Sequence, residues 1–220
     1  MAHEDDGNRR LRADARANRE QLLCAARDVF GEQGLDASIA EVARRADVGI
    51  GTLYRHFPDR DALVTAVFDE KMDAYSAAIE DAHADPDPWR GFCTYVERVC
   101  AMQAGDRGFM NVLTSTFPSS HRFEARRRST HARLVELIGR AQEAGRLRPD
   151  FVAEDVALLL MANAGVVAAT AHTIPDAWRR TVSYLLQAFD ARNTDPLPPA
   201  PTPARMVRAM ARTRRGTRSR

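Results

Sequence analysis

The chain has 220 residues, of which 45% are hydrophobic and 28% are charged, enough for one large or two small domains with a buried core. Its formal net charge is only +2, yet the segment 204–220 holds seven arginines and no acidic residue. The remainder is therefore acidic, and the overall charge says little about the folded part of the chain.

The sequence lacks the patterns of export signals and membrane spans. The N-terminal residues have no apolar stretch of the kind that marks a signal peptide. The longest apolar run, 156–171, contains Asn163 and is shorter than the about 18 residues of a membrane-spanning helix. Cys24, Cys93 and Cys100 form neither a CxxC pair nor a cluster with histidine, which favours reduced, buried thiols over a redox sensor. We expect a soluble cytoplasmic protein that needs no metal and no other cofactor.

The chain opens on a polar stretch, 1–15, whose lack of periodicity predicts a disordered arm. From Arg16 onward, apolar residues recur at spacings of three and four, which predicts a helix. Gly34 stands where the C-terminal cap of that helix belongs.

Two short helices are expected next. Ser38 at the N-cap and Glu41 at position N3 form a capping box that begins a helix over 39–46. A turn at 47–49 separates this helix from a second one over 50–57, and a proline stops the second helix.

Longer helices dominate the rest of the sequence. Asp59 caps a helix that runs from Arg60 to about residue 83. Periodicity and terminating residues then predict further helices over 89–104, 109–115, 121–144, 153–172 and 175–191. No strand-like alternation of useful length occurs, so the expected fold class is all-α, with about nine helices.

The C-terminal segment contrasts with these helices. Five prolines in the nine residues 195–203 predict an extended linker. The arginine-rich tail behind it is expected to be disordered, although Met206, Val207 and Met210 would share one face of a transient basic helix. A solvated tail and a segment with non-specific attraction to DNA phosphates both fit this composition.

The two short helices carry the chemistry. Together with the three-residue turn and the longer helix before them, they describe a helix-turn-helix. The second helix of this motif lies in the major groove of DNA. Gly49 and Gly51 permit a close approach of its first turn, while Thr52, Tyr54 and His56 can donate hydrogen bonds to phosphate oxygens.

Other residues of the motif have roles within the protein. Leu53 and Phe57, four residues apart, share a face that can pin the second short helix to the first. Arg44 and Arg45 end the first short helix, where they either reach a DNA phosphate or complement the helix dipole. The sequence leaves both roles open.

Residues 18–65 read NREQLLCAARDVFGEQGLDASIAEVARRADVGIGTLYRHFPDRDALVT. Within them AARDVF, IAEVARRADV, GTLYRHF and DRDAL follow one another at the spacing of the TetR family of transcriptional regulators, and the stretch resembles the DNA-binding domain of that family. The resemblance implies a helix-turn-helix domain over 16–58, a helical ligand-binding and dimerisation domain over 59–193, and a linker with a tail over 194–220.

The resemblance also implies particular DNA contacts. The positions that match the family's contacts are Asn18, Ser38, Ile39, Gly49, Ile50, Gly51, Thr52, Tyr54, His56 and Arg60. Arg60 replaces the family's usual lysine, Gly49 replaces a common serine, and Ile50 offers only apolar contact. Because few base-reading donors remain, we expect phosphate positioning and DNA shape to carry more of the recognition.

A homodimer built from the last two long helices is a further implication. The run that begins at Val156 is apolar nearly all round and therefore needs burial on several sides. Small residues would let a partner helix approach and larger ones would fill the space, and the expected interface residues are Ala162, Gly165, Ala169, Trp178, Tyr184 and Leu185. Such a dimer would bind the half-sites of a palindromic operator in double-stranded DNA.

Aromatic and methionine side chains gather in the central helices, where they form either ordinary core or the wall of an apolar pocket. The residues expected to bind a ligand there are Met72, Tyr75, Phe92, Tyr95, Met102, Met110, Phe117 and Asn163. Further candidates for polar anchors are His121, His131 and His172.

The sequence thus predicts a transcriptional repressor that a small apolar or aromatic ligand releases from its operator. The alternative is an architectural DNA-binding protein that binds no ligand and gains general affinity from its basic tail. An enzyme is not expected, because the sequence shows no paired carboxylates with metal-ligand spacing, no nucleophile motif and no phosphate loop.

Overall fold

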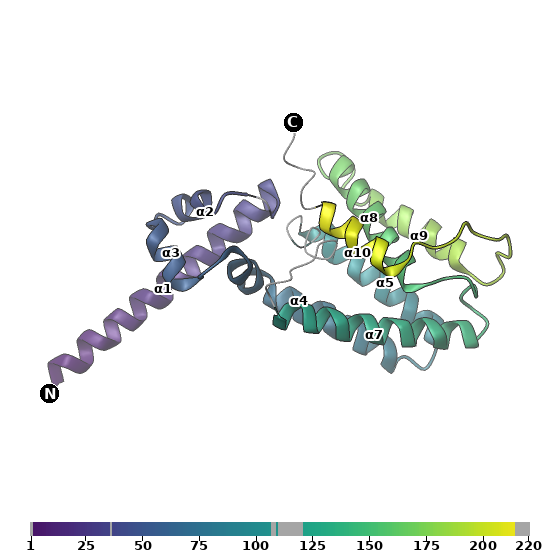
Figure 1. Ribbon diagram of the computed structural model, residues 1–220, viewed down its shortest axis with the longest axis horizontal. Coiled ribbons are helices and arrows are strands. Elements are labelled where there is room, and N and C mark those ends of the chain that lie inside the picture. Colours follow the sequence, from purple (N-terminus) through teal and green to yellow (C-terminus); the bar gives the residue numbers. More distant parts are fainter. Residues whose placement is uncertain (1, 36, 107–108, 110–120, 214–220) are drawn as a thin grey trace. The chain divides into compact units, whose positions relative to one another are not determined.

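The computed structural model describes the chain in four stretches, residues 2–35, 37–106, 109 and 121–213. These residues form helices joined by turns and loops (Figure 1). Within them the strand-type pairing is limited to an isolated β-bridge between Leu147 and Asp190, so the predicted all-α fold class is confirmed. The helix expected over 109–115 lies almost entirely outside the described stretches.

The described helices are α1 (Ala2–Gln33), α2 (Ile39–Arg45), α3 (Ile50–His56), α4 (Arg60–Ala84), α5 (Pro88–Gly105), α7 (His121–Glu143), α8 (Ala153–Thr170), α9 (Ala177–Phe189) and α10 (Pro203–Thr213). The chain divides into two compact units, Met1–Asp69 and Glu70–Arg220. The boundary lies within α4 and not at Pro58, where the sequence suggested it. The first turns of α4 belong to the core of the first unit, in which Phe68 stacks on Phe30 with ring centroids 6.4 Å apart.

Helix α1 is longer than the sequence predicted. It begins at Ala2, so the expectation of a disordered arm is wrong for residues 2–15. Extending an existing helix costs much less than nucleating one, and this stretch contains no proline and one glycine, Gly7. The helix ends as expected, because Gly34 adopts a φ of +80° and its N–H donates to the Phe30 carbonyl (3.0 Å).

Helix α2 begins at the predicted N-cap, but the expected capping box is only half formed. The Ser38 hydroxyl accepts a hydrogen bond from the Ala40 N–H (3.2 Å). The Glu41 carboxylate does not complete the box; it accepts two hydrogen bonds from the Arg44 guanidinium (2.7 and 2.8 Å). A bidentate hydrogen-bonded ion pair of this kind is stronger than a single hydrogen bond to a backbone N–H.

Helix α3 has seven residues, too few to be stable alone in water. Two buried side chains, Leu53 and Phe57, hold it in the first unit, as their spacing predicted. The Arg19 guanidinium of α1 covers the Phe57 ring at 5.3 Å from its centroid. The preceding turn places Asp47 at a φ of +54°, a left-handed conformation that aspartate tolerates better than most residues.

Helix α5 is central to the second unit, where it packs against α7, α8 and α9. At its first turns, Phe151 lies edge-on to both Phe92 and Phe189, with ring centroids 5.4 and 4.7 Å apart. Helices α4 and α7 run side by side (Figure 1) and are joined by Arg133, which donates to both carboxylate oxygens of Glu80 (3.1 and 2.9 Å).

The segment beyond α9 also departs from expectation. The proline-rich linker contains no helix as far as Thr202, but α10 then follows. The prediction of a disordered tail is therefore wrong for residues 203–213, whereas residues 214–220 lie outside the described stretches. Helix α10 packs against α8 and buries Met206, which gives the apolar face of the tail a partner.

We predict opposite effects from one substitution at two glycines of the first unit. A Cβ at Gly31, within α1, would meet no atom within 4 Å, so Gly31→Ala should stabilise the unit by about 0.5–1 kcal/mol. Gly34 has a positive φ, so Gly34→Ala should destabilise it by about 1–2 kcal/mol. Urea unfolding followed by circular dichroism measures both, and equal effects of the two substitutions would contradict this account of the helix end.

Candidate functional site

Helix α3 has one buried and one exposed face. Leu53 is 1% exposed, whereas Ile50 is 44% and Tyr54 is 49% exposed. Gly49 and Gly51 lie on the exposed side as well. The structure therefore brings the residues predicted to meet bases together on one outward-facing surface.

No close contact among the described residues requires glycine at either of these positions. A Cβ built at Gly49 or Gly51 would meet no atom within 4 Å. Neither residue has a positive φ, and Gly49 has an ordinary extended conformation (φ −65°, ψ 144°). Gly51 lies inside α3, where glycine weakens the helix, whereas Gly49 is the N-cap, a position at which glycine is well tolerated. Gly51 is therefore the position at which glycine costs stability without an intrachain contact to explain it.

The residues predicted to grip phosphates differ in accessibility. Tyr54 is exposed, while Thr52 and His56 are half-buried. The His56 ring lies beside Phe57, with centroids 6.3 Å apart. All three occupy the seven-residue helix that Leu53 fixes in place, so their directions are set by the same buried contact.

The residues predicted to contact phosphates at the starts of α1 and α2 also differ in exposure. Asn18 is half-buried, and Ser38 is exposed but uses its hydroxyl oxygen to cap α2. The Ile39 side chain is buried. Ile39 can therefore meet a phosphate only through its backbone N–H.

Arg60 has a role that its sequence position did not reveal. Its guanidinium donates to the Leu35 carbonyl (2.5 Å), which ties the start of α4 to the loop after α1. The contact of Arg60 with a DNA phosphate stays a prediction.

Arg44 and Arg45 lie in the last turn of α2, as the helix-dipole role requires, and each also pairs with an acidic side chain. Arg44 pairs with Glu41 within α2, and Arg45 pairs with Glu32 of α1 (2.7 Å in each case). Hydrogen bonds from these arginines lower the pKa of the Glu41 and Glu32 carboxyls. The two arginines thus brace α2 internally and against α1.

Sequence reasoning left Arg55 unassigned. This residue is exposed on α3 and pairs with no acidic side chain among the described residues. It follows Gly51 by four positions, so the two share a helical face. That spacing was the available signal, and it places a guanidinium beside the glycine surface.

A stripe of small residues runs along α8. Ala162, Gly165 and Ala169 are exposed, and Leu158, which is also exposed, extends the stripe by one turn. A Cβ at Gly165 would meet no atom within 4 Å. Helix α8 is apolar and long enough to cross a bilayer, a weak signal that core helices share, yet only 28% of it is buried within the chain.

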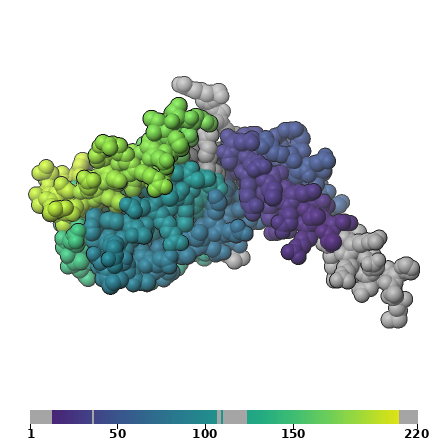
Figure 2. All heavy atoms as spheres, turned by 180° about the vertical axis from the view of Figure 1, so that it is seen from behind, coloured from purple at the N-terminus to yellow at the C-terminus, as the bar shows by residue number. Residues whose placement is uncertain are grey.

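The residues predicted on α9 separate into two groups. Tyr184 is 56% exposed and Leu185 is half-buried, and α9 lies at the surface of the second unit when seen from behind (Figure 2). Trp178 is buried within the second unit, with the Arg179 guanidinium 4.7 Å from its ring. Trp178 is therefore a core residue, which corrects its assignment to an interface.

The residues predicted to bind a ligand differ in how deeply they are buried. Those buried in the core are Met72, Phe92, Tyr95 and Asn163. Those that are half-buried are Tyr75 and Met102. The two that lie outside the described stretches are Met110 and Phe117.

Hydrogen bonds explain the positions of the polar members of this set. Asn163 donates to the Gln103 side-chain oxygen (2.9 Å) and to the Cys100 carbonyl (3.3 Å), so it joins α8 to α5. The Tyr95 hydroxyl donates to the Tyr75 hydroxyl (3.1 Å). Burial raises the pKa of both tyrosines, which therefore stay protonated at neutral pH.

A cavity of about 530 Å³ lies between α7, α8 and α10, with one wall residue from α4. Its lining residues are Tyr75, Glu124, Arg127, Arg128, His131, Leu134, Ala153, Glu154, Val156, Ala157, Leu160, Met161, Pro203, Met206 and Val207. Of the residues expected to bind a ligand, Tyr75 and the polar candidate His131 are in this set. The sequence did not predict the α10 wall, because the tail was expected to be disordered.

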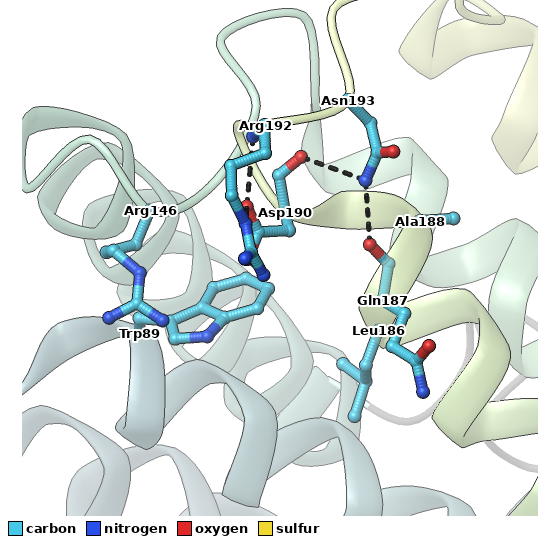
Figure 3. A pocket seen from close by; sticks show the side chains of 8 residues that line it. All are labelled: Trp89, Arg146, Leu186, Gln187, Ala188, Asp190, Arg192 and Asn193. Atoms are coloured by element: carbon cyan, nitrogen blue, oxygen red, sulfur yellow. Dashed lines mark hydrogen bonds and ion pairs between the residues drawn. The ribbon is translucent and has the colours of Figure 1, made fainter.

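A second hollow, of about 670 Å³, lies where α5 begins and α9 ends. Figure 3 shows Trp89, Arg146 and Arg192 around it. Arg192 pairs with Asp190 (2.9 Å), and hydrogen bonds from Arg192 lower the pKa of the Asp190 carboxyl to about 2. The lining of this second hollow is about half polar, so it suits an apolar ligand less well than the more apolar cavity under α10.

The two cysteines of α5 are protonated thiols. Cys93 and Cys100 are free, and burial raises the pKa of each thiol to about 12. No set of three His, Cys, Asp or Glu side chains within the described stretches is placed to hold a metal ion.

Two family models match the chain. The model described as "Bacterial regulatory proteins, tetR family" matches residues 22–67, which include α2, α3 and the start of α4. The model described as "Transcriptional regulator SbtR-like, C-terminal domain" matches residues 87–187, from α5 into α9. The two matches together span more than half of the chain.

Individual relatives agree with this assignment. The HTH-type transcriptional regulator SAR0097 of Staphylococcus aureus (strain MRSA252) is 36% identical over 88 residues, which are 39% of this chain and 46% of that protein. The match thus spans less than half of that relative's length.

Solved structures share the fold. A bacterial regulatory protein in the tetR family from Rhodococcus RHA1 superposes with a TM-score of 0.57 at 22% identity, covering 78% of this chain and 96% of that one. RolR, crystallised with resorcinol, superposes with a TM-score of 0.51 at 19% identity, covering 86% and 99%. The chain belongs to the TetR family of transcriptional regulators, with an N-terminal helix-turn-helix DNA-binding domain, and it is a regulator rather than an enzyme.

Proposed function

We propose that the protein is a cytoplasmic repressor that binds a palindromic operator as a homodimer and is released by a small apolar or aromatic ligand. The observation that carries the DNA-binding part is the exposed start of α3, where neither Gly49 at the N-cap nor Gly51 within the helix has a neighbouring atom that requires glycine. A major groove about 12 Å wide accounts for glycine there, because a helix without side chains at these positions can lie deeper in it.

The exposed surface of α3 divides into two functions. Gly49, Ile50 and Gly51 face the base edges, where Ile50 offers apolar contact to a thymine methyl. The Tyr54 hydroxyl bonds a phosphate next to them, and Arg55 adds a charged contact on the same face. Recognition then depends on fit and phosphate positioning more than on base-specific hydrogen bonds.

The small-residue stripe of α8 supports the dimer. An exposed apolar stripe such as the one from Leu158 to Ala169 is uncommon on a monomer and marks an interaction surface. Gly165 at its centre allows close approach of the same stripe from a second copy, and Tyr184 of α9 lies exposed at the surface of the same helix pair. Two copies of α3 can then reach half-sites about 34–36 Å apart.

Release by a ligand follows from a shift in population between two forms of the dimer. A ligand weakens operator binding only if it prefers the form that does not bind DNA. The cavity lined by α7, α8 and α10 supplies an apolar site of suitable size. RolR binds resorcinol, a small aromatic molecule, but the ligand class proposed here rests on the cavity of this chain.

We predict that Gly51→Ala separates folding from DNA binding. The added methyl group meets open space within the protein, so stability should stay equal or rise by up to about 1 kcal/mol. In the groove it should clash and weaken binding about tenfold or more, given the about 1–3 kcal/mol cost of overpacking. Fluorescence anisotropy on DNA selected by the unmodified protein measures this effect. Gly31→Ala is the matched control, and Gly51→Ala binding as tightly as that control would refute the groove assignment.

Contacts to phosphate should be distinguishable from contacts to bases. Tyr54→Phe removes one hydrogen bond to a charged group and should weaken binding to every sequence by about tenfold. Arg55→Ala should lower the slope of log affinity against log salt by about one. Salt titrations on several DNA sequences measure both effects. A changed base preference in Tyr54→Phe, or an unchanged salt slope in Arg55→Ala, would show that the respective assignment is wrong.

A charged side chain in the stripe should break the dimer contact. Gly165→Arg places a long charged side chain in the stripe and should give a folded monomer with strongly reduced operator affinity. Gly139→Arg is the control, because Gly139 lies on α7 and a Cβ there also meets open space. Size-exclusion chromatography with light scattering measures the mass, and a Gly165→Arg dimer that still binds DNA normally would rule out this interface.

A further inference from the structure

Helix α10 forms a wall of the largely apolar cavity in the second unit. It packs against α8, and Pro203, Met206 and Val207 line the cavity. Met206 is 6% exposed, whereas Val207 is 53% exposed. The helix therefore rests on the cavity through the face that carries Met206, while Val207 is half exposed to solvent.

A set of hydrogen bonds holds the start of the linker that leads to α10. The buried Arg148 side chain donates to Asp150 (2.5 and 2.9 Å) and to the Asp195 carbonyl (2.6 Å). Asp150 in turn accepts the Leu197 N–H (3.5 Å). These bonds fix the start of the linker beside the turn between α7 and α8, and the prolines keep the following residues extended. A short tether of this kind lowers the entropic cost of docking α10.

The walls of the cavity favour an uncharged, apolar occupant. The apolar lining from α7 and α8 includes Leu134, Val156, Ala157, Leu160 and Met161. Among the charged lining residues, Glu124 and Arg127 pair with each other (3.5 Å), and Arg128 and Glu154 have opposite signs. The lining therefore carries no net charge when His131 is neutral.

The Tyr75 hydroxyl is a polar group of this lining that can meet a ligand. The Tyr75 hydroxyl accepts a hydrogen bond from Tyr95, which leaves its own O–H as a donor. Tyr75 lines the cavity, so this donor can meet an acceptor on a bound molecule. The volume of about 530 Å³ lies in the usual range of about 300–1,000 Å³ for small-molecule sites.

We propose that this cavity binds an uncharged, mainly apolar molecule that carries a hydrogen-bond acceptor, and that α10 is the wall that closes over it. The acceptor bonds Tyr75, and the apolar body packs between α7, α8 and Met206. Entry and exit require α10 to lift away on its linker. The inference rests on the ligand-released function proposed above and assigns the site of that ligand.

Prodan, an uncharged naphthyl ketone whose emission reports on its surroundings, is a suitable probe. The full-length protein should bind it saturably with blue-shifted emission. Met206→Asp should undock α10 and speed dissociation at least about tenfold, as measured by stopped-flow fluorescence. Arg205→Asp is the matched control, because Arg205 is an exposed residue of α10 that does not line the cavity, and it should change neither affinity nor rate.

Two further variants, Ala157→Phe and Tyr75→Phe, test whether prodan binds in this cavity. Ala157→Phe fills the cavity and should weaken prodan binding at least about tenfold, whereas Ala132→Phe, at an exposed position on α7, should not. Tyr75→Phe removes the donor and should weaken binding about fivefold without altering the helical content. The site is overturned if prodan does not bind saturably, or if Met206→Asp and Ala157→Phe bind and release it as the unmodified protein does.

Operator binding measured on the same samples distinguishes the proposal of ligand release from the proposal that the ligand binds in this cavity. Prodan binding that follows the predicted pattern supports the cavity site even if operator affinity is unchanged, and that result counts against release through this site. Prodan that weakens operator binding equally in Ala157→Phe and in the unmodified protein supports ligand release but overturns the cavity assignment.

Discussion

The burial of Leu53 is the contact on which the DNA-binding surface depends. Helix α3 is too short to form alone, and burying one leucine contributes about 1.5–3 kcal/mol. The same contact fixes the rotation of the helix about its axis. A helix turns about 100° per residue, so Gly51, two positions before Leu53, lies on the side opposite the core, and Ile50 and Tyr54 are also exposed.

Local signals made this half of the chain predictable. Gly34 ends α1 and Ser38 begins α2 because a cap acts within a few residues of its helix, and these positions agree with the structure. The roles of Arg45 and Arg60 were not predictable, because their partners lie far along the sequence, on Glu32 and in the Leu35 carbonyl. The sequence shows that an arginine is present and not which oxygen it will reach.

The second unit shows the limit of periodicity. A pattern of apolar residues marks the inner face of a helix, but it does not distinguish a face that meets another helix from one that meets a cavity. Phe92 and Tyr95 are core residues, whereas Tyr75 reaches the cavity. The apolar face around Met206 was visible in the sequence, but the groove on α7 and α8 that receives it was not.

The central claim is that two copies of α3 read a symmetric site through close fit in the major groove. Selection of bound fragments from a random-sequence DNA library, followed by footprinting of the enriched sequence, tests this claim most directly. The account predicts an inverted repeat whose two protected half-sites are centred about 10 base pairs, or a multiple of that spacing, apart. Binding without an enriched sequence or without a symmetric footprint would contradict it and would indicate an architectural DNA-binding protein.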